Sequence, residues 1–302
     1  MSNISVWHIR EDMNAPISLK DESSLDAITR QLPEGYYSTF RTYAGATRAL
    51  GLSAHFQRLY KPVAAPEVDE MFLRRQLSIL LEAYRPDEAR VRAVMTRDGQ
   101  VYLAVAPLAP LPREIYERGV RVETTELRRE NPHLKSTAFI SNSDSERKHI
   151  AQEGIFEALL VKDGKILEGM TSNFFYVLRT PEELQDDAEH ASSVLVAEST
   201  SHSAQRGTIL GTARDGILLG ITRETVIEIA RGRGLEIKYE PLRRDQIATV
   251  SEAFITSSSR GIVPVVQIDN VTIGQGSPGL LTQQLGEDYE PYVIEKAEKI
   301  LP

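Results

Sequence analysis

Residues 166–175 read Ile-Leu-Glu-Gly-Met-Thr-Ser-Asn-Phe-Phe and lie between segments with the composition of β-strands. Upstream, Asp163-Gly164 separates two short apolar segments, a pattern that is typical of a hairpin turn. Downstream, residues 173–178 form a further apolar strand. Glu168 therefore lies at a junction between strands. It is either a hairpin carboxylate exposed to water or a carboxylate that stabilises a positive charge by direct pairing.

Length and composition restrict the classes of protein to which this chain can belong. Its 302 residues are enough for two domains, and 41% hydrophobic with 26% charged residues is ordinary for a globular protein. The net charge of −8 predicts no affinity for nucleic acid or for an anionic membrane. Because the chain has no cysteine and no apolar leader at its N-terminus, we expect a cytoplasmic protein.

The order of predicted elements indicates an α/β chain. In the first part, residues 36–43 are rich in aromatic residues and threonine, which predicts a strand. A helical pattern follows Pro66, and two apolar strands then flank Asp98-Gly99, a second hairpin signal. The first part of the chain therefore combines a sheet with amphipathic helices.

A proline-rich stretch at 107–112 marks the predicted domain edge. We expect a smaller N-terminal α/β domain over 1–115 and a larger C-terminal α/β domain over 116–302. In the larger domain, residues 180–205 form a polar stretch that predicts an exposed insertion, and the last helix is predicted to end at Ile300.

Five separated segments carry the residues that point to a function. They are Ser-Ala-His-Phe-Gln-Arg-Leu at 53–59, Pro-His-Leu-Lys-Ser-Thr at 132–137, the stretch 166–175, Ile-Leu-Leu-Gly-Ile-Thr-Arg at 217–223 and Glu-Ala-Phe-Ile-Thr-Ser-Ser at 252–258. Each alone has an ordinary structural explanation, such as a surface lysine, a helix cap or a polar turn. Together and in this order they resemble the signature of the fold-type-IV aminotransferases. That family includes branched-chain aminotransferases, D-amino-acid transaminases and aminodeoxychorismate lyases.

The resemblance implies a cofactor and a fold. It implies two α/β domains with pyridoxal 5'-phosphate at their interface, in a homodimer or a larger homo-oligomer. Lys135 would bind the aldehyde of the cofactor and, once released by the substrate, move the proton of the substrate Cα. Glu168 would pair with the pyridine nitrogen and keep it protonated.

The same resemblance implies a phosphate site. Arg58 would contact the phosphate oxygens through its permanently charged guanidinium. The backbone amides of Ile221 and Thr222 would hold the phosphate at the start of a helix, where free N–H groups and the helix dipole converge. The other residues implied in cofactor binding are Asn173, Gly220, Ser257 and Ser258.

The substrate side departs from each sub-family. Branched-chain aminotransferases often have a tyrosine five residues after the lysine, where this chain has Ile140. Arg92 matches an arginine of their substrate-carboxylate site, although Arg90 replaces the usual tyrosine two residues before it. Thr39 matches the lyases, and Tyr37 matches a tyrosine of the D-amino-acid transaminases. The candidates for substrate contact are Tyr37, Thr39, Tyr43, Arg92 and Arg97.

We expect the chain to catalyse transamination of an apolar or branched-chain amino acid with a 2-oxo acid such as 2-oxoglutarate. An aminodeoxychorismate-lyase-type activity and a D-amino-acid transaminase are the alternatives within the family. A cofactor-free binding protein would be expected to lose Lys135 and Glu168 first, and a phosphate-sugar enzyme would leave both unexplained. The chain lacks the common nucleotide-binding and hydrolase motifs. Its six histidines are scattered singly, so no metal site is expected.

Overall fold

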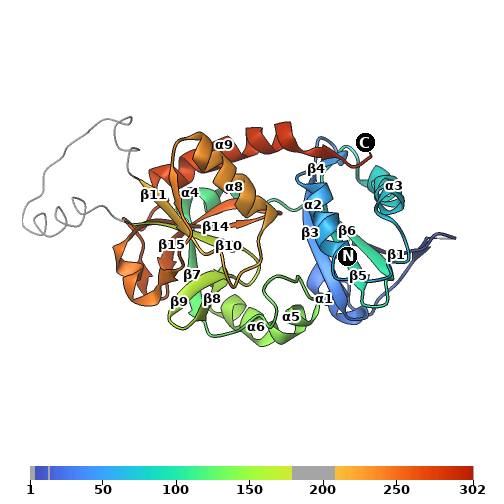
Figure 1. The fold of residues 1–302 in the computed structure, drawn as a ribbon, viewed down its shortest axis with the longest axis horizontal. Helices are drawn as coiled ribbons and strands as arrows, with labels where there is room; N and C mark the ends of the chain where they lie inside the picture. Colours follow the sequence, from blue (N-terminus) through green and yellow to red (C-terminus); the bar gives the residue numbers. More distant parts are fainter. Residues whose placement is uncertain (1–3, 13, 179–207, 302) are drawn as a thin grey trace, which may run out of the picture.

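The computed structural model describes residues 4–12, 14–178 and 208–301, so the predicted insertion at 180–205 lies outside the described residues. The described residues form two β-sheets, each in its own lobe with its own helices (Figure 1). Strands from the first 107 residues build most of one sheet, which a short strand at residues 298–299 completes, and strands between residues 120 and 272 build the other. The mixture of sheets and helices confirms the predicted α/β class, and the bounds of the two domains stay a prediction.

The first sheet is antiparallel, with the strand order β17, β4, β3, β5, β6, β1, β2. The bounds are Glu298–Lys299 for β17, Arg48–Ala49 for β4, Gly35–Tyr43 for β3, Ala89–Thr96 for β5, Val101–Pro107 for β6, Ser5–Ile9 for β1 and Ala15–Pro16 for β2. The predicted hairpin is β5–β6, and Gly99 in its turn has φ of 95°. A Cβ atom at Gly99 would lie 2.0 Å from the carbonyl oxygen of Ala65, so only glycine fits this turn.

Helices cover this sheet and complete its core. They are α1 (Leu25–Gln31), α2 (Leu52–Tyr60), α3 (Glu70–Leu81) and the short 3-10 helix η1 (Glu82–Tyr84). Helix α3 begins after Asp69, whose carboxylate accepts a hydrogen bond from the Phe72 N–H at 2.6 Å. Leu73, Leu77 and Leu81 recur along one face of α3 and are fully buried in the core of this lobe.

The second sheet has the strand order β12, β11, β10, β14, β15, β7, β8, β9, β13, with β16 beside β15. The bounds are Glu236–Lys238 for β12, Ile209–Thr212 for β11, Asn173–Leu178 for β10, Val250–Ser257 for β14, Gly261–Ile268 for β15, Val120–Thr125 for β7, Glu157–Lys162 for β8, Lys165–Gly169 for β9, Leu242–Arg243 for β13 and Val271–Thr272 for β16. Strand β9 pairs with both β8 and β10, so β10, β14, β15, β7, β8 and β9 close into a barrel-like ring. The pairing that closes the ring joins Asn173 to Glu168, within the stretch 166–175.

Helices of the second lobe are α4 (Arg113–Arg118), α5 (Ala138–Asn142), α6 (Asp144–Gln152), α8 (Ile221–Gly232) and α9 (Leu280–Lys296), with the 3-10 helix η2 (Arg244–Thr249). Helix α9 lies along the second lobe, and the segment after it leads the C-terminus across to β4 of the first lobe (Figure 1). The prediction that the last helix continues to Ile300 is wrong. Residues 298–299 pair with β4 as strand β17, and Arg48 donates a hydrogen bond to the Ala297 carbonyl at 2.7 Å. Ile300 then packs into the first core, which offsets the lost helical turn.

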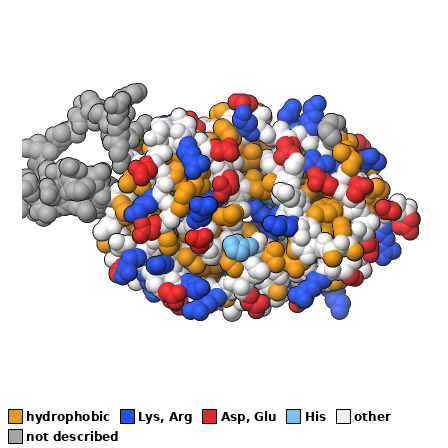
Figure 2. Space-filling view, viewed as in Figure 1, with side chains coloured by type: hydrophobic (Ala, Val, Ile, Leu, Met, Phe, Trp, Pro, Cys, Tyr) orange, Lys and Arg blue, Asp and Glu red, His pale blue; other side chains and the backbone are white. Residues whose placement is uncertain are grey.

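The surface carries charges of both signs. Lysine and arginine side chains alternate with aspartate and glutamate over the face seen in Figure 2. Among the described residues, no helix combines the length and the apolar character needed to span a bilayer.

Candidate active site

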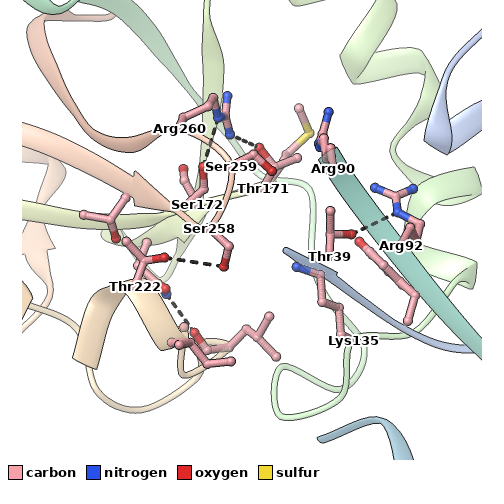
Figure 3. Close-up of a pocket in the computed structure, with 18 of the residues that line it drawn as sticks. Thr39, Arg90, Arg92, Lys135, Thr171, Ser172, Thr222, Ser258, Ser259 and Arg260 are labelled. Carbon is pink, nitrogen blue, oxygen red and sulfur yellow. Dashed lines mark hydrogen bonds between the residues drawn. The ribbon is translucent and has the colours of Figure 1, made fainter. Parts of the chain in front are cut away.

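A cavity of about 320 Å³ lies where strands β3 and β5 of the first lobe face the barrel of the second. It collects nearly all of the predicted site residues. Those that line it are Tyr37, Thr39, Arg58, Arg92, Lys135, Glu168, Asn173, Gly220, Ile221, Thr222, Ser257 and Ser258. In Figure 3, Lys135 and Thr39 on one side face Thr222 and Ser258 on the other. Tyr43 packs in the core instead, and Arg97 is exposed outside the cavity, paired with Glu34 at 3.1 Å.

Lys135 is held against the start of β3 by backbone hydrogen bonds. The Tyr37 N–H donates to the Lys135 carbonyl at 2.9 Å, and the Thr137 N–H donates to the Gly35 carbonyl at 2.9 Å. The Lys135 amine lies 5.1 Å from the centroid of the Tyr37 ring. Burial lowers the pKa of Lys135 well below its ordinary value, and the nearby Arg58 guanidinium lowers it further. A lowered pKa favours the neutral amine, which is both a nucleophile and a base.

Glu168 is the next-to-last residue of strand β9, at the closure of the barrel, and is almost fully buried. One of its oxygens accepts the Leu218 N–H at 3.0 Å, and the Asn173 amide lies 3.4 Å from the same oxygen. Burial raises the pKa of Glu168 to about 7, although Arg129 and the Leu218 N–H act in the opposite direction. A buried carboxylate with so few charged partners is ready to pair with a further positive group.

Arg129 is a site residue that the sequence did not reveal. Its Nε lies 3.1 Å from Glu168 Oε1, and its Nη2 donates to the Met170 carbonyl at 3.1 Å. The guanidinium also stacks 3.9 Å from the centroid of the Phe139 ring. In the sequence, Arg129 belongs to a charged run, Glu-Leu-Arg-Arg-Glu, which reads as solvated surface, so no local pattern separates it from its neighbours.

The start of helix α8 presents groups to the cavity that can bind an anion. Its N-cap residue, Gly220, supplies no side chain, so the first amides of the helix open onto the cavity. Beside them the Thr222 hydroxyl lies 3.4 Å from the Ser258 hydroxyl. Arg58 approaches from α2 and donates to the Leu219 carbonyl at 2.6 Å. A Cβ atom at Gly220 would lie 2.1 Å from Asn173 Oδ1, so glycine allows the close approach of this helix to β10.

These groups fit pyridoxal phosphate. Thr256 Oγ1 and His55 Nε2 line the cavity and are buried without a hydrogen-bond partner among the described residues. Buried polar atoms of this kind are normally satisfied, so both indicate a ligand with polar groups. Burial, together with Arg58 and Lys135, holds the pKa of His55 well below its ordinary value, so its imidazole is neutral. An anion beside Arg58 and the start of α8 would account for this collection of unpaired donors.

The first lobe adds a wall of arginines to the cavity. Arg92 donates to Thr39 Oγ1 at 3.0 Å and pairs with Asp26 at 2.5 Å. Asp26 also pairs with Arg147 of helix α6 at 3.0 Å, so it connects the two lobes. Burial acts against ionisation, but Arg92 and Arg147 together lower the pKa of Asp26. Arg92, a predicted substrate residue, therefore already has a carboxylate partner.

Arg260 was likewise absent from the predicted site. Its Nε donates to the Ser257 hydroxyl at 3.0 Å, and its Nη2 lies 3.3 Å from the buried carboxylate of Glu157. Arg260 therefore connects the turn between β14 and β15 with strand β8. Within the described ranges, no group of three or more His, Asp or Glu side chains is placed to hold a metal ion.

The chain is similar to known proteins over most of its length. Residues 35–268 match the family model described as "Amino-transferase class IV". The chain is 28% identical to a D-alanine aminotransferase of Bacillus licheniformis over 95% of this chain and 98% of that protein. It is 28% identical to a putative branched-chain-amino-acid aminotransferase of Methanocaldococcus jannaschii, over 85% and 86% of the two chains. The structure of a hypothetical aminotransferase from Mycobacterium tuberculosis in its PLP-bound form shares the fold, with a TM-score of 0.69, 19% identity, and 96% of this chain and 99% of that chain covered.

Proposed function

This chain belongs to the class IV aminotransferase family, and from that premise we propose that it transfers the amino group of an apolar or branched-chain amino acid to a 2-oxo acid such as 2-oxoglutarate. The observation that carries the proposal is one cavity that holds a half-buried lysine with a lowered pKa, a buried carboxylate and an uncapped helix start. The branched-chain aminotransferases among the relatives support the apolar substrate.

Pyridoxal phosphate, the cofactor of this family, supplies an aldehyde for the amino group and a ring that withdraws electrons from the substrate Cα. Residues of this chain would hold it at both ends. Arg58, the Ile221 and Thr222 amides and the Ser258 hydroxyl would bind its phosphate, because these donors converge at the start of α8. Glu168 would pair with its ring nitrogen, since this carboxylate is buried and Arg129 fixes its orientation.

Lys135 moves the proton in this proposal. Its lowered pKa favours the neutral amine, which can accept a proton from the Cα atom of a bound amino acid. The protonated Lys135 amine can then donate that proton to the intermediate that leads to the product. The backbone hydrogen bonds between this segment and the start of β3 hold Lys135 at the wall of the cavity, where its amine can reach a bound substrate.

The test is a visible absorption spectrum of the protein loaded with pyridoxal phosphate, recorded before and after addition of L-leucine, L-glutamate and D-alanine in turn. We expect L-leucine and L-glutamate to change the spectrum and 2-oxoglutarate to restore it. No response to any amino donor would contradict transamination and favour the lyase alternative. The variant Lys135→Ala provides the control, since its spectrum would not respond.

A second candidate is transamination of a D-amino acid. It is favoured by the D-alanine aminotransferase relative, which matches 95% of this chain. Tyr37 lies beside Lys135 in the cavity, where it could contact either substrate. A response of the loaded protein to D-alanine with no response to L-leucine would select this candidate.

The assembly and the location are also proposals. The family resemblance supports a homodimer, and the acidic, cysteine-free sequence supports a cytoplasmic protein. Light scattering of the purified protein would give its mass, and a value equal to the chain mass of 33.7 kDa would contradict the dimer.

A further inference from the structure

We propose that Arg90 binds the α-carboxylate that the amino-acid and 2-oxo-acid substrates share. This inference rests on the proposed transaminase function and adds a residue to its substrate site. Arg90 lies on β5, two residues before Arg92, so both side chains extend from the same face of the strand toward the cavity. Figure 3 shows Arg90 at the side of the cavity near Thr171 and Arg92, across open space from Ser258.

The argument begins with the partners of the cationic side chains. Among the described residues, six arginines line the cavity. Four of them have a carboxylate partner: Arg92 and Arg147 share Asp26, Arg129 pairs with Glu168, and Arg260 pairs with Glu157. Arg58 extends from α2 to the start of α8, where it donates a hydrogen bond to the Leu219 carbonyl. The sixth is Arg90.

The Arg90 side chain forms no hydrogen bond or ion pair within the part of the chain that the structure describes, and its Nε is buried. A buried guanidinium nitrogen without an acceptor destabilises the protein unless a ligand supplies one. Neighbouring charges increase this cost. Burial, together with the nearby Arg92 and Arg260, lowers the pKa of Arg90 to about 10, yet the group stays charged at neutral pH.

Arg90 needs a hydrogen-bond acceptor that also carries a negative charge, and a carboxylate meets this need better than other substrate groups. Its two oxygens match the planar donors of a guanidinium, and its charge offsets the excess of arginines on this wall. The only group common to every amino acid and every 2-oxo acid, apart from the reacting carbon and its amine or oxo substituent, is the α-carboxylate. Arg90 therefore serves both halves of the reaction, and an amine that lacks a carboxylate would be a poor donor.

Binding of non-reactive acids separates this role from turnover. Pentanoate has one carboxylate and glutarate has two, and neither can exchange an amino group. We would titrate both into the cofactor-loaded protein by calorimetry, for the wild type and for Arg90→Gln, Arg90→Lys and Arg41→Gln. Arg41 is the matched control, because it is opposite Arg90 in the β3–β5 register but lines a separate cavity. Retention of the visible absorption of the cofactor would show that each variant is folded.

We expect Arg90→Gln to weaken binding of both acids by about 10- to 100-fold, the range for a lost charge-assisted hydrogen bond. Arg90→Lys keeps the charge but not the bidentate geometry and would recover part of that loss. Arg41→Gln would bind both acids within about twofold of the wild type. In turnover, Arg90→Gln would raise KM for the amino donor more than it lowers kcat.

Unchanged pentanoate binding by Arg90→Gln would overturn the proposal. Loss of glutarate binding alone would also overturn it, because it would place Arg90 at a distal carboxylate. These outcomes are distinct from failure of the proposed function. That failure would appear as a wild-type spectrum that responds to no amino donor, whether or not the acids bind.

Discussion

The two walls of the cavity use different means to place their charged groups. On the wall from the second lobe, the proposed binding groups are backbone amides, hydroxyls and one glutamate that come from short contiguous segments, such as 166–175 and the start of α8. On the wall from the first lobe, the charges come from arginines on β5, and the position of such an arginine depends on an ion pair with a residue that is distant in sequence. Arg92 pairs with Asp26, which lies 66 positions earlier in the chain.

The two walls therefore have different proposed roles. The second-lobe wall would hold the cofactor, and the first-lobe wall would contact the substrate. The second-lobe wall is built from local turns and from the strand pairing of Glu168 with Asn173, which closes the ring. Charges on the first-lobe wall can be freed or neutralised by single substitutions that leave the sheet intact. We therefore expect substitutions in the second-lobe wall to impair cofactor binding or turnover, and those in the first-lobe wall to change how tightly substrates bind.

The largest effect is expected at Lys135, where the second lobe meets β3. Lys135→Ala would fold, because its backbone bonds to Tyr37 do not use the side chain. Turnover would fall by on the order of 10⁴-fold or more, since the nucleophile and the base for the Cα proton are lost together. Steady-state assays with the best donor would measure the loss, and Lys165→Ala, an exposed lysine on β9, is the control. Full turnover in Lys135→Ala would refute the assignment of the site.

The next effect concerns Glu168 on the same wall. Glu168→Gln keeps the shape of the side chain and its contact with the Leu218 N–H but removes its negative charge. We expect the variant to bind pyridoxal phosphate and to lose turnover by about 10²-fold or more, because the ring nitrogen would lack its ionic partner. Comparing the cofactor dissociation constant with kcat separates the two effects. An unchanged kcat would show that the carboxylate has no role in the reaction.

Glu168 also predicts a pH dependence of stability in the cofactor-free protein. Its pKa is raised in the folded state from 4.5 to about 7, so the folded state binds the proton more tightly than the unfolded state. The stabilising contribution is complete below pH 4.5 and is lost as the pH rises through 7, by about 3 kcal/mol in total. The melting temperature of the wild type would therefore fall relative to that of Glu168→Gln between about pH 4.5 and 8. If the melting temperatures of the wild type and Glu168→Gln differed by the same amount at about pH 4.5 and at about pH 8, the raised pKa would be contradicted.

The contrast between the two walls also explains which site residues could be predicted from the sequence and which could not. Lys135, Glu168 and Thr222 belong to contiguous motifs that resemble those of a known family, so the sequence could assign them to one candidate site, and all three line the same cavity. Arg129 is buried because Glu168 and Phe139 surround it, and neither neighbour is near it in sequence. The partner of Arg92 depends on where helix α1 packs. Strand β17 forms because β4 offers it a free edge, which a helical pattern ending at Ile300 does not reveal.

A smaller effect on the second-lobe wall is expected from Gly220→Ala. The added Cβ would lie 2.1 Å from Asn173 Oδ1, so the start of α8 must move away from β10. The first helical amides would then miss the phosphate, and we expect cofactor affinity to fall about tenfold with the fold retained. Titration with pyridoxal phosphate measures this. Gly232→Ala, at the other end of α8 with no atom within 4 Å of its Cβ, is the matched control and would bind normally. Equal affinities would mean that the start of α8 does not hold the phosphate.

The smallest effect, and the one that tests the first-lobe wall, is expected from Asp26→Asn. Asp26 is held ionised by Arg92 and Arg147, so this substitution removes a charge and leaves both arginines without their carboxylate. The freed Arg92 can then bind a second carboxylate of a substrate. We expect KM for the dicarboxylic 2-oxoglutarate to fall a few-fold relative to KM for the monocarboxylic pyruvate, with kcat changed less than about tenfold.

The ratio of the two KM values decides this last prediction, because a general loss of stability would change both acceptors alike. Asp144→Asn is the control, since Asp144 pairs with Arg30 and Lys148 on the surface and does not line the cavity. A shifted ratio in Asp26→Asn alone would show that a carboxylate on α1 determines which charges the first-lobe wall offers to the substrate. An unchanged ratio would mean that Arg92 is structural even when unpaired, and that substrate preference is set elsewhere on this wall.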